Sequence, residues 1–348
     1  MTGEAIAVLP VSEPTRTQLV QSLLETRLQL GEQEGGKTDC VRLCRGLADG
    51  IEGMLIDRFG PLVLAVDYRQ RQADSIDAKG LAKLVHSVSP DLHVVAKVRD
   101  SVDGSNAFLA ASMASANADA TAALLVAYER GLMFEIRTDP AHDFGIFLDA
   151  AKARVFVRAH AVGKRVLNLF SYAGAFGIAA AAGGAAEVTN IDPNRDYLAW
   201  SRRNAELNGL SMRVLPDTTQ DFLGKHLRRL ARNPETPGFD MVIVDPPAFC
   251  VGRGDERLMR LLWPQVFESL RVMKPKQLVL LCNDKSFRSR QSFADLVQEE
   301  LGSLYRFERL GTCLRQEDLR SELPSVAWKV QVEDPHYVEP VVLAGERT

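Results

Sequence analysis

Hydrophobic positions recur with different spacings in successive parts of the 348-residue chain. From about Thr15 to Leu30, leucines and valines lie at the three- and four-residue intervals that predict an amphipathic helix. From Val41 to about Ser115, short apolar runs such as Met54–Ile56 and Leu62–Val66 are separated by glycine-containing turns. This second pattern is typical of strands, so we expect a small β-rich region there.

An alternation of apolar strands with helices begins near Ala120. We expect strands at Leu132–Ile136, Arg165–Phe170, Glu187–Ile191, Met212–Leu215, Met241–Val244, Gln277–Leu281 and Val326–Val332. We expect helices at Phe147–Val162, Ile178–Ala182, Asp196–Leu207, Leu258–Val272 and Ser292–Leu301. Such alternation predicts a parallel sheet with helices on both faces, and ligands of these sheets bind beyond the carboxyl ends of the strands.

These patterns divide the chain into three predicted segments. An N-terminal helix and linker occupies residues 1–36, and Gly31, Gly35 and Gly36 interrupt the helical spacing there. A small β-rich domain occupies 37–118, and a larger α/β domain occupies 119–348. We therefore expect an α/β fold whose main sheet follows a smaller α+β domain.

A strand, a tight glycine loop and a helix follow one another from Val166 to Gly177. Gly174 would let the backbone approach a ligand closely. Asp192 ends the next strand, about 20 residues on, where a carboxylate can accept hydrogen bonds from both hydroxyls of a ribose. Asp217 ends the third strand and could accept from an adenine amino group. These residues predict a nucleotide-like cofactor, and the alternative is that the two acids only cap helices or turns.

The loop also separates two classes of cofactor. A dinucleotide needs a free helix N-terminus for its pyrophosphate, usually with the pattern Gly-x-Gly-x-x-Gly. Tyr172 and Ala173 stand where the first glycines would be. A sulfonium cofactor carries no phosphate, so the loop favours S-adenosylmethionine. A nicotinamide-dependent oxidoreductase on a similar sheet is the alternative.

The apolar strand Met241–Val244 runs into the sequence Asp245-Pro246-Pro247-Ala-Phe249. Two prolines fix the backbone and leave carbonyl groups without neighbouring N–H donors. This turn can present Asp245 to a planar base, and Phe249 could stack on that base or fill the core. A rigid turn with only a structural role is the alternative.

Several segments together resemble the large-subunit ribosomal RNA methyltransferases of bacteria, which are class I enzymes that use S-adenosylmethionine. Their two relevant branches methylate cytosine C5 or guanine N7. The resemblance covers roughly Val41 to Phe287, and the segments that carry it are Val41–Gly60, Gly145–Asp149, Asn168–Gly177, Val188–Asp192, Tyr197–Gly209 and Asp245–Phe249.

The resemblance implies a seven-stranded Rossmann-like methyltransferase sheet with S-adenosylmethionine at its edge. It implies cofactor contacts at Asn168, Phe170, Ser171, Tyr172, Gly174, Asp192, Pro193, Asp217 and Asp245. It implies a substrate or catalytic role near Asp245–Phe249, so Asp245, Pro246, Pro247 and Phe249 are candidates. Residue chemistry adds Cys282, as a candidate nucleophile, and Asn283, which fits hydrogen bonding to a base edge.

The sequence departs from the family pattern at three places. Only about 40 residues precede the β-rich region, where family members often carry an RNA-binding PUA domain. The pattern Phe-Leu-Asp-(Gln/His)-Arg ends here in Ala150 and Ala151, which removes a polar pair and leaves a non-catalytic RNA-binding or assembly factor as a third hypothesis. The segment Leu281–Phe287 is closer to the Ser-Asn-Asn-Lys of the guanine branch than to the Ser-Cys-Ser of the cytosine branch.

The chemistry of the base favours a nitrogen target. Cytosine C5 is a poor nucleophile, so its methylation needs a thiolate that adds to the ring. Guanine N7 has an exposed lone pair, and positioning beside the methyl donor can suffice. Cys250 and Cys282 are the thiols near the reaction edge, and a strand cysteine is more often a small buried hydrophobe. We expect RNA, in particular ribosomal RNA, as the substrate, with guanine N7 favoured over cytosine C5.

Composition adds constraints on partners and location. The net charge of −3 gives no overall basic footprint, so RNA contacts would depend on local arginine clusters such as Arg228, Arg229 and Arg232, which are otherwise solvated helix faces. Five scattered cysteines suit a reducing cytosol, and Cys40 and Cys44 lack the second pair that a zinc site needs. The chain has no apolar signal core and no run of about 18 apolar residues. We expect a cytoplasmic protein without a metal site or a membrane segment.

Overall fold

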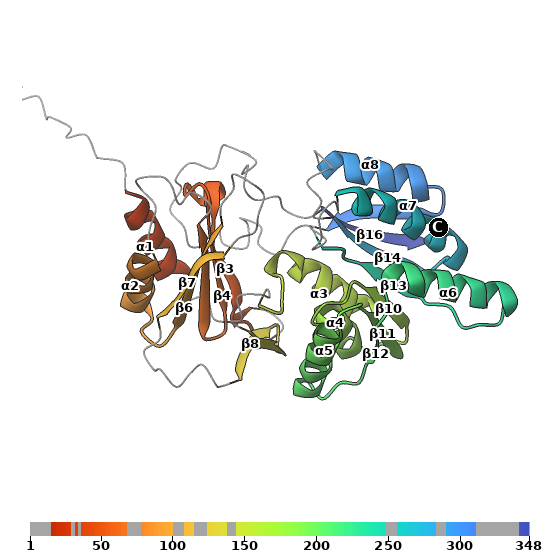
Figure 1. Cartoon of the computed structure of the whole chain (residues 1–348), viewed down its shortest axis with the longest axis horizontal. Helices are drawn as coiled ribbons and strands as arrows, with labels where there is room; N and C mark the ends of the chain where they lie inside the picture. The colour runs from red at the N-terminus through yellow and green to blue at the C-terminus, as the bar shows by residue number, and fades with distance from the viewer. Residues whose placement is uncertain are drawn as a thin grey trace, which may run out of the picture.

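The structure is a computed structural model, and it describes residues 15–28, 32–33, 36–67, 78–99, 108–114, 124–137, 144–247, 256–282, 290–310 and 341–347. Figure 1 shows two bodies side by side, one built around a five-stranded sheet from the first third of the chain and one around a seven-stranded sheet from the rest. A two-stranded hairpin lies between them.

The seven-stranded sheet confirms the expected Rossmann-like α/β fold. Its spatial order is β12-β11-β10-β13-β14-β16-β15. The first five strands pair in parallel, and β16 is antiparallel to both of its neighbours. The strands are β10 (Arg165–Leu169), β11 (Glu187–Ile191), β12 (Arg213–Leu215), β13 (Met241–Val244), β14 (Gln277–Cys282), β15 (Tyr305–Leu310) and β16 (Val341–Arg347). From β10 the chain adds β11 and β12 on one side of the sheet and then β13 and β14 on the other side. The strand order therefore reverses between β10 and β13.

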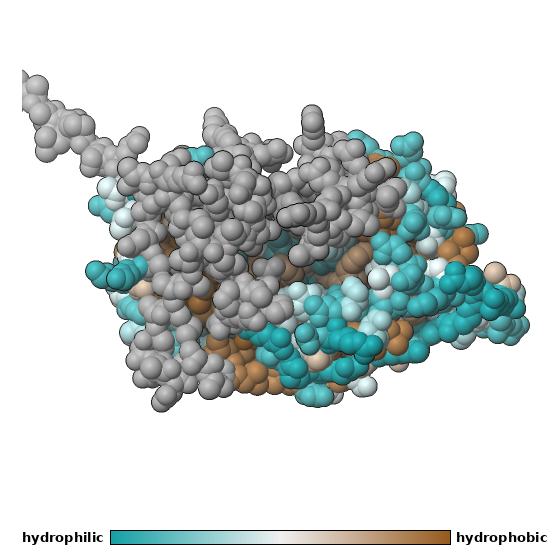
Figure 2. All heavy atoms as spheres, in the orientation of Figure 1, coloured by the Kyte–Doolittle hydropathy of each residue, from teal (hydrophilic) through white to brown (hydrophobic). Residues whose placement is uncertain are grey.

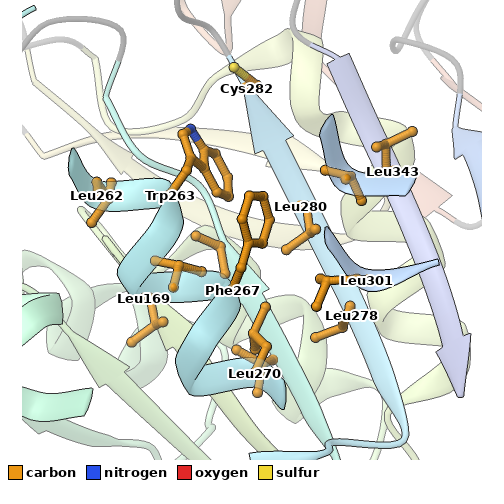
Figure 3. Packing of buried hydrophobic residues seen from close by; sticks show 14 of the residues in the cluster. Leu169, Leu262, Trp263, Phe267, Leu270, Leu278, Leu280, Cys282, Leu301 and Leu343 are labelled. Carbon is orange, nitrogen blue, oxygen red and sulfur yellow. The ribbon is translucent and has the colours of Figure 1, made fainter. Parts of the chain in front are cut away.

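Helices cover both faces of this sheet, which explains why β13 and β14 are buried at every position and apolar at all of them except Gln277. The helices are α3 (Ala151–His160), α4 (Ala175–Ala182), α5 (Arg195–Leu207), α6 (Thr219–Arg232), α7 (Glu256–Met273) and α8 (Arg290–Leu301). Helices α3 and α4 bury one face, while α6, α7 and α8 bury the other. Figure 3 shows Trp263 and Phe267 of α7 packed over Leu278 and Leu280 of β14.

The five-stranded sheet has the order β3-β4-β5-β6-β7. Its strands are β3 (Cys40–Arg45), β4 (Met54–Phe59), β5 (Leu62–Asp67), β6 (His93–Arg99) and β7 (Phe108–Ala114). Helices α1 (Arg16–Arg27) and α2 (Ala78–Val88) pack on one face, where Val20 and Leu24 of α1 join the apolar cluster of the sheet. Helix α1 therefore shares its core with this sheet.

The hairpin of β8 (Leu125–Glu129) and β9 (Leu132–Ile136) connects the two bodies. The Asp39 N–H donates to the Tyr128 carbonyl at 2.9 Å, which joins β8 to the small body. The Glu135 N–H donates to Asn204 Oδ1 at 2.7 Å, which joins β9 to α5. The predicted boundaries at residues 36 and 118 remain predictions.

Most predicted elements of the larger body are confirmed, and the differences have physical reasons. Strand β10 ends at Leu169 because Phe170 takes a positive φ of 57°. Helix α6 was not expected, since its sequence is rich in arginine and contains Gly224. Helix α2 and strands β15 and β16 were also not expected. The predicted strand Val326–Val332 lies outside the described residues. Among the helices that the structure describes, none has the length and apolarity needed to cross a membrane.

The ion pair between Arg154 of α3 and Glu129 of β8 generates a prediction about stability. Both side chains are buried, and Nε and Nη2 donate to the carboxylate at 2.7 and 2.6 Å. Replacing Arg154 by Met leaves Glu129 as a buried unpaired charge, so we expect a loss of about 3–5 kcal/mol in the free energy of unfolding, measured in urea.

The matched control is the pair of Lys276 and Asp240 at 2.8 Å, whose lysine is exposed. Lys276→Met should cost less than about 1 kcal/mol, because water can solvate Asp240 when the lysine is removed and ion pairs at the surface contribute little. Similar losses of unfolding free energy in the two variants would show that the buried pair contributes no more to stability than the pair at the surface.

Candidate active site

Parallel register brings the predicted site residues to one edge of the seven-stranded sheet. Leu169 lies opposite both Ile191 and Val244, and Ile191 lies opposite Leu215. The residues that follow these strands therefore emerge side by side at the carboxyl edge. They are Phe170, Asp192, Asp245 and, two residues beyond the end of β12, Asp217.

The loop after β10 is held in an unusual conformation. Phe170 and Tyr172 have φ values of 57° and 47°, a region that costs free energy for residues other than glycine. The Ser171 N–H donates to the Ile191 carbonyl at 2.9 Å, which ties the loop to β11. Gly174 has a φ of 85°, and a Cβ at this position would overlap the side chain of Ser201. The loop can close onto α5 only with glycine there.

A buried amide network supports this loop from below. Asn168 Nδ2 donates to Asn190 Oδ1 at 2.9 Å, and Asn190 Nδ2 donates to Ser201 Oγ at 3.1 Å. A Cβ at Gly177 would overlap the Asn190 side chain. Asn168, which was predicted to contact the cofactor, is 1% exposed and lies beneath the loop.

Asp192 is buried at the end of β11, and its carboxylate accepts two backbone hydrogen bonds. Oδ2 accepts from the Tyr172 N–H at 3.0 Å and Oδ1 from the Asn194 N–H at 2.9 Å. Burial raises the pKa of Asp192, and these two N–H groups oppose that shift. The N-cap of α5 is Asn194, which accepts from the N–H groups of Asp196 and Tyr197. Asp192 is thus not the helix cap, and each of its oxygens keeps a lone pair for a hydroxyl donor.

Pro193 is exposed beside Asp192, and Asp217 lies one strand further along the edge. Asp217 Oδ2 pairs with Lys225 Nζ at 2.7 Å. The N-cap of α6 is Thr218, whose hydroxyl accepts from the Asp221 N–H at 3.1 Å. Asp217 is therefore engaged by a lysine and does not cap the helix.

Asp245 begins the Asp-Pro-Pro turn, and its carboxyl group is surrounded by protein although the residue keeps some exposed surface. Burial raises its pKa to about 7, the negative charge of Asp149 adds to the rise, and the guanidinium of Arg154 opposes it. Pro246 is buried and Pro247 is exposed. A buried carboxyl group beside a second acid favours a positively charged ligand.

Two of the predicted substrate-side residues, Phe249 and Asn283, lie outside the described residues. Cys282 is described at the end of β14. It is 4% exposed and belongs to the apolar cluster that includes Trp263 of α7, as Figure 3 shows.

Sequence reasoning missed an aromatic group around the loop. The ring of Tyr172 lies 4.6 Å from that of Tyr197, 5.5 Å from Trp200 and 5.6 Å from Phe147, centre to centre. Phe147 is 44% exposed, although it is large and apolar. The three-residue spacing of Tyr197 and Trp200 on α5 was the available signal, because it puts both rings on one helix face.

The edge fits a nucleoside that carries a positive charge. Asp192 can receive a sugar diol, and the Ser171 hydroxyl is buried with no hydrogen-bond partner among the described residues. Asp149 and Asp245 place negative charge nearby. Together these groups suit S-adenosylmethionine, whose sulfur is cationic.

Comparison with known proteins agrees with this chemistry. A protein-family model described as S-adenosylmethionine-dependent methyltransferase matches residues 84–315. A relative from Klebsiella pneumoniae (strain 342), named ribosomal RNA large subunit methyltransferase I, is 31% identical over 227 residues, which cover 64% of this chain and 54% of the relative. A relative of the same name from Escherichia coli O127:H6 is 29% identical over 238 residues, covering 67% and 57%. The chain spans about half the length of the curated relatives it matches.

Solved structures share the fold. A methyltransferase complexed with SAH matches with a TM-score of 0.69 at 23% identity, covering 95% of this chain and 80% of the other. A SAM-dependent methyltransferase from Agrobacterium tumefaciens matches with a TM-score of 0.61 at 19% identity, covering 90% and 92%. The family match covers well over half of the chain and favours S-adenosylmethionine over a nicotinamide cofactor, so this protein belongs to the S-adenosylmethionine-dependent methyltransferase family.

Proposed function

We propose that this protein transfers a methyl group from S-adenosylmethionine to a base of ribosomal RNA. The observation that carries the proposal is the similarity of about two thirds of the chain to proteins named ribosomal RNA large subunit methyltransferase I. The Asp-Pro-Pro turn at the carboxyl edge of β13 supports it, because a rigid turn there can hold a flat base beside the cofactor. The third hypothesis, a non-catalytic factor that keeps the fold, predicts no transfer.

The cofactor would be held by the loop after β10 and by the acids that follow β11 and β12. Asp192 would accept hydrogen bonds from the ribose, with Pro193 beside it. Ser171, Phe170, Tyr172 and Gly174 would form the wall of the site, and Asn168 would support that wall from beneath. Asp217 would accept from the adenine amino group in place of its bond to Lys225. When bound, S-adenosylmethionine supplies an electrophilic methyl group on a positively charged sulfur.

Guanine N7 is the favoured target, with cytosine C5 as the alternative. A cytosine enzyme needs an accessible thiolate, and Cys282 is packed among apolar side chains. Guanine becomes positively charged when N7 is methylated, so the carboxyl groups of Asp149 and Asp245 would stabilise the product at this edge. Pro246 and Pro247 would fix the position of Asp245, while Phe249 and Asn283 would contact the base.

Methyl transfer to RNA tests the proposed function directly. We expect labelled methyl groups to enter unmodified ribosomal RNA, and nucleoside mass analysis to identify N7-methylguanine. Asp245→Ala should lower incorporation by about a hundredfold or more, because it removes charge stabilisation at the reacting base. Cys282→Ala and Cys250→Ala should each leave the rate within about twofold of the wild type.

Incorporation as 5-methylcytosine, together with loss of activity in either cysteine variant, would assign the protein to the cytosine branch. Absence of incorporation into any RNA by a protein that still binds S-adenosylmethionine would contradict the RNA substrate.

Substitution of Gly174 in the loop after β10 provides a second test, and Gly209 provides the matched control. Gly174→Ala places a Cβ against Ser201 at a φ of 85°, so we expect at least about a tenfold loss of affinity for S-adenosylmethionine, measured by calorimetry. Gly209 also has a positive φ, 63°, but a Cβ there meets nothing within 4 Å. Gly209→Ala should therefore cost some stability and leave the affinity unchanged. Equal losses of affinity would exclude the loop as the cofactor wall.

The raised pKa of Asp245 predicts how cofactor affinity depends on pH. A cationic sulfur favours the ionised carboxylate, whereas protonation near pH 7 removes that attraction. The affinity for S-adenosylmethionine should therefore fall about tenfold between pH 8 and pH 6, and that for the uncharged product S-adenosylhomocysteine should change much less. Asp245→Asn should abolish the difference between the two ligands. Parallel pH profiles for both ligands in the wild type would place Asp245 away from the sulfur.

A further inference from the structure

A cavity of about 240 Å³ lies between helix α6 and the strands β10, β11 and β12. Residues of the loop and of the Asp-Pro-Pro turn do not line it, although it shares Asp217 with the proposed cofactor site. Arg165, Glu187 and Arg213, at the starts of these strands, form part of its wall. Asp217 and Lys225 also line it, from the carboxyl side. The cavity therefore extends along the edge strand beneath α6.

Two residues that line the cavity each have a buried polar atom without a hydrogen-bond partner among the described residues. These atoms are Nε2 of His226, a residue that is 3% exposed, and Oγ1 of Thr189, a residue that is 2% exposed. A buried polar group without a partner costs about 1–3 kcal/mol, so two in one cavity call for an occupant.

The chemistry of His226 shows what kind of atom that occupant must present. Nη2 of Arg229 lies 3.4 Å from Nδ1 of His226, and a guanidinium can only donate. Burial, followed by the charges of Arg229 and Arg165, lowers the pKa of His226, which favours the neutral ring. Nδ1 is then the acceptor and Nε2 carries the hydrogen. The Thr189 hydroxyl can donate as well, so the cavity offers donors that need an acceptor.

The charges around the cavity select an anion among possible acceptors. Glu187 is paired with Arg165 at 3.0 Å, and Asp217 is paired with Lys225 at 2.7 Å. Arg213 and Arg229 also line the cavity, and neither has a carboxylate partner in the part of the chain that the structure describes. The wall thus carries two guanidinium groups in excess of its carboxylates, and guanidinium groups bind phosphate oxygens well.

We propose that this cavity binds an oxyanion of the phosphate class, held by Thr189 Oγ1, His226 Nε2 and the guanidinium groups of Arg213 and Arg229. The phosphate belongs either to an RNA backbone or to a small free anion, since both present the same oxygens. The outer surface of α6 is hydrophilic, as Figure 2 shows, so a chain of phosphates can approach it. The site does not rest on the proposed methylation of RNA.

Binding of inorganic phosphate to the full chain tests the site. Phosphorus NMR line broadening or calorimetry at constant ionic strength, with chloride as the reference anion, would give the affinity. Thr189→Val keeps the shape of the side chain and removes the hydroxyl, and Arg213→Gln removes one guanidinium. We expect each to weaken phosphate binding by about tenfold, the effect of losing one charge-assisted or buried hydrogen bond.

The matched control is Arg228→Gln, an exposed arginine on the same helix that does not line the cavity. It should change phosphate affinity by less than about twofold, because exposed charges are well screened. Unchanged affinity for S-adenosylmethionine in all three variants would show that the fold is intact.

Competition identifies the source of the phosphate. Displacement of inorganic phosphate by a short RNA would assign the site to an RNA backbone, and failure to displace it would assign the site to a free anion. No phosphate binding by the wild type would overturn the proposal. So would equal weakening by Arg228→Gln, which indicates general electrostatics, or full binding by Thr189→Val, which indicates that water satisfies the two buried atoms.

Discussion

Parallel pairing of β10 with both β11 and β13 is the constraint on which the site depends. Because Leu169 is level with Ile191 and with Val244, three separate loops must leave the sheet at one edge. No side-chain contact is needed to bring Asp192 and Asp245 into the same region, since the backbone register does so. The side chains then determine what the edge can bind. Asp192 and Asp245 provide two buried carboxyl groups, and the loop after β10 lies beside them in its unusual backbone conformation.

Arg154 contributes both to the stability of the protein and to the electrostatics of its site. It pairs with Glu129 of the hairpin and also lowers the pKa of Asp245, so one guanidinium serves two acids. Replacing Arg154 would therefore disturb the hairpin and the charge of the site together.

The sequence predicts the central strands well and the interactions between distant residues poorly. Met241–Val244 was predicted with its correct bounds, because a strand buried on both faces is apolar throughout. Glu187–Ile191 was also predicted with its correct bounds, although it carries the buried polar residues Thr189 and Asn190. The effect of Asp149 on Asp245, and the pairing of Arg154 with Glu129, follow from tertiary packing that no periodicity encodes. The positive φ angles of Phe170 and Tyr172 were also hidden, since neither residue type favours them. For α6, the charged residues and Gly224 obscured a helix whose apolar face is narrow.

Helix α6 is the element that the carboxyl edge and the cavity have in common. Lys225 pairs with Asp217 at the edge, while His226 and Arg229, on the same turn and the next, face the cavity with Lys225. Lys225 is not among the proposed ligands of the anion, so its bond to Asp217 is kept when the cavity is filled. The two places share α6 as a wall but use different side chains, which is why substitutions can separate loss of anion binding from loss of cofactor binding.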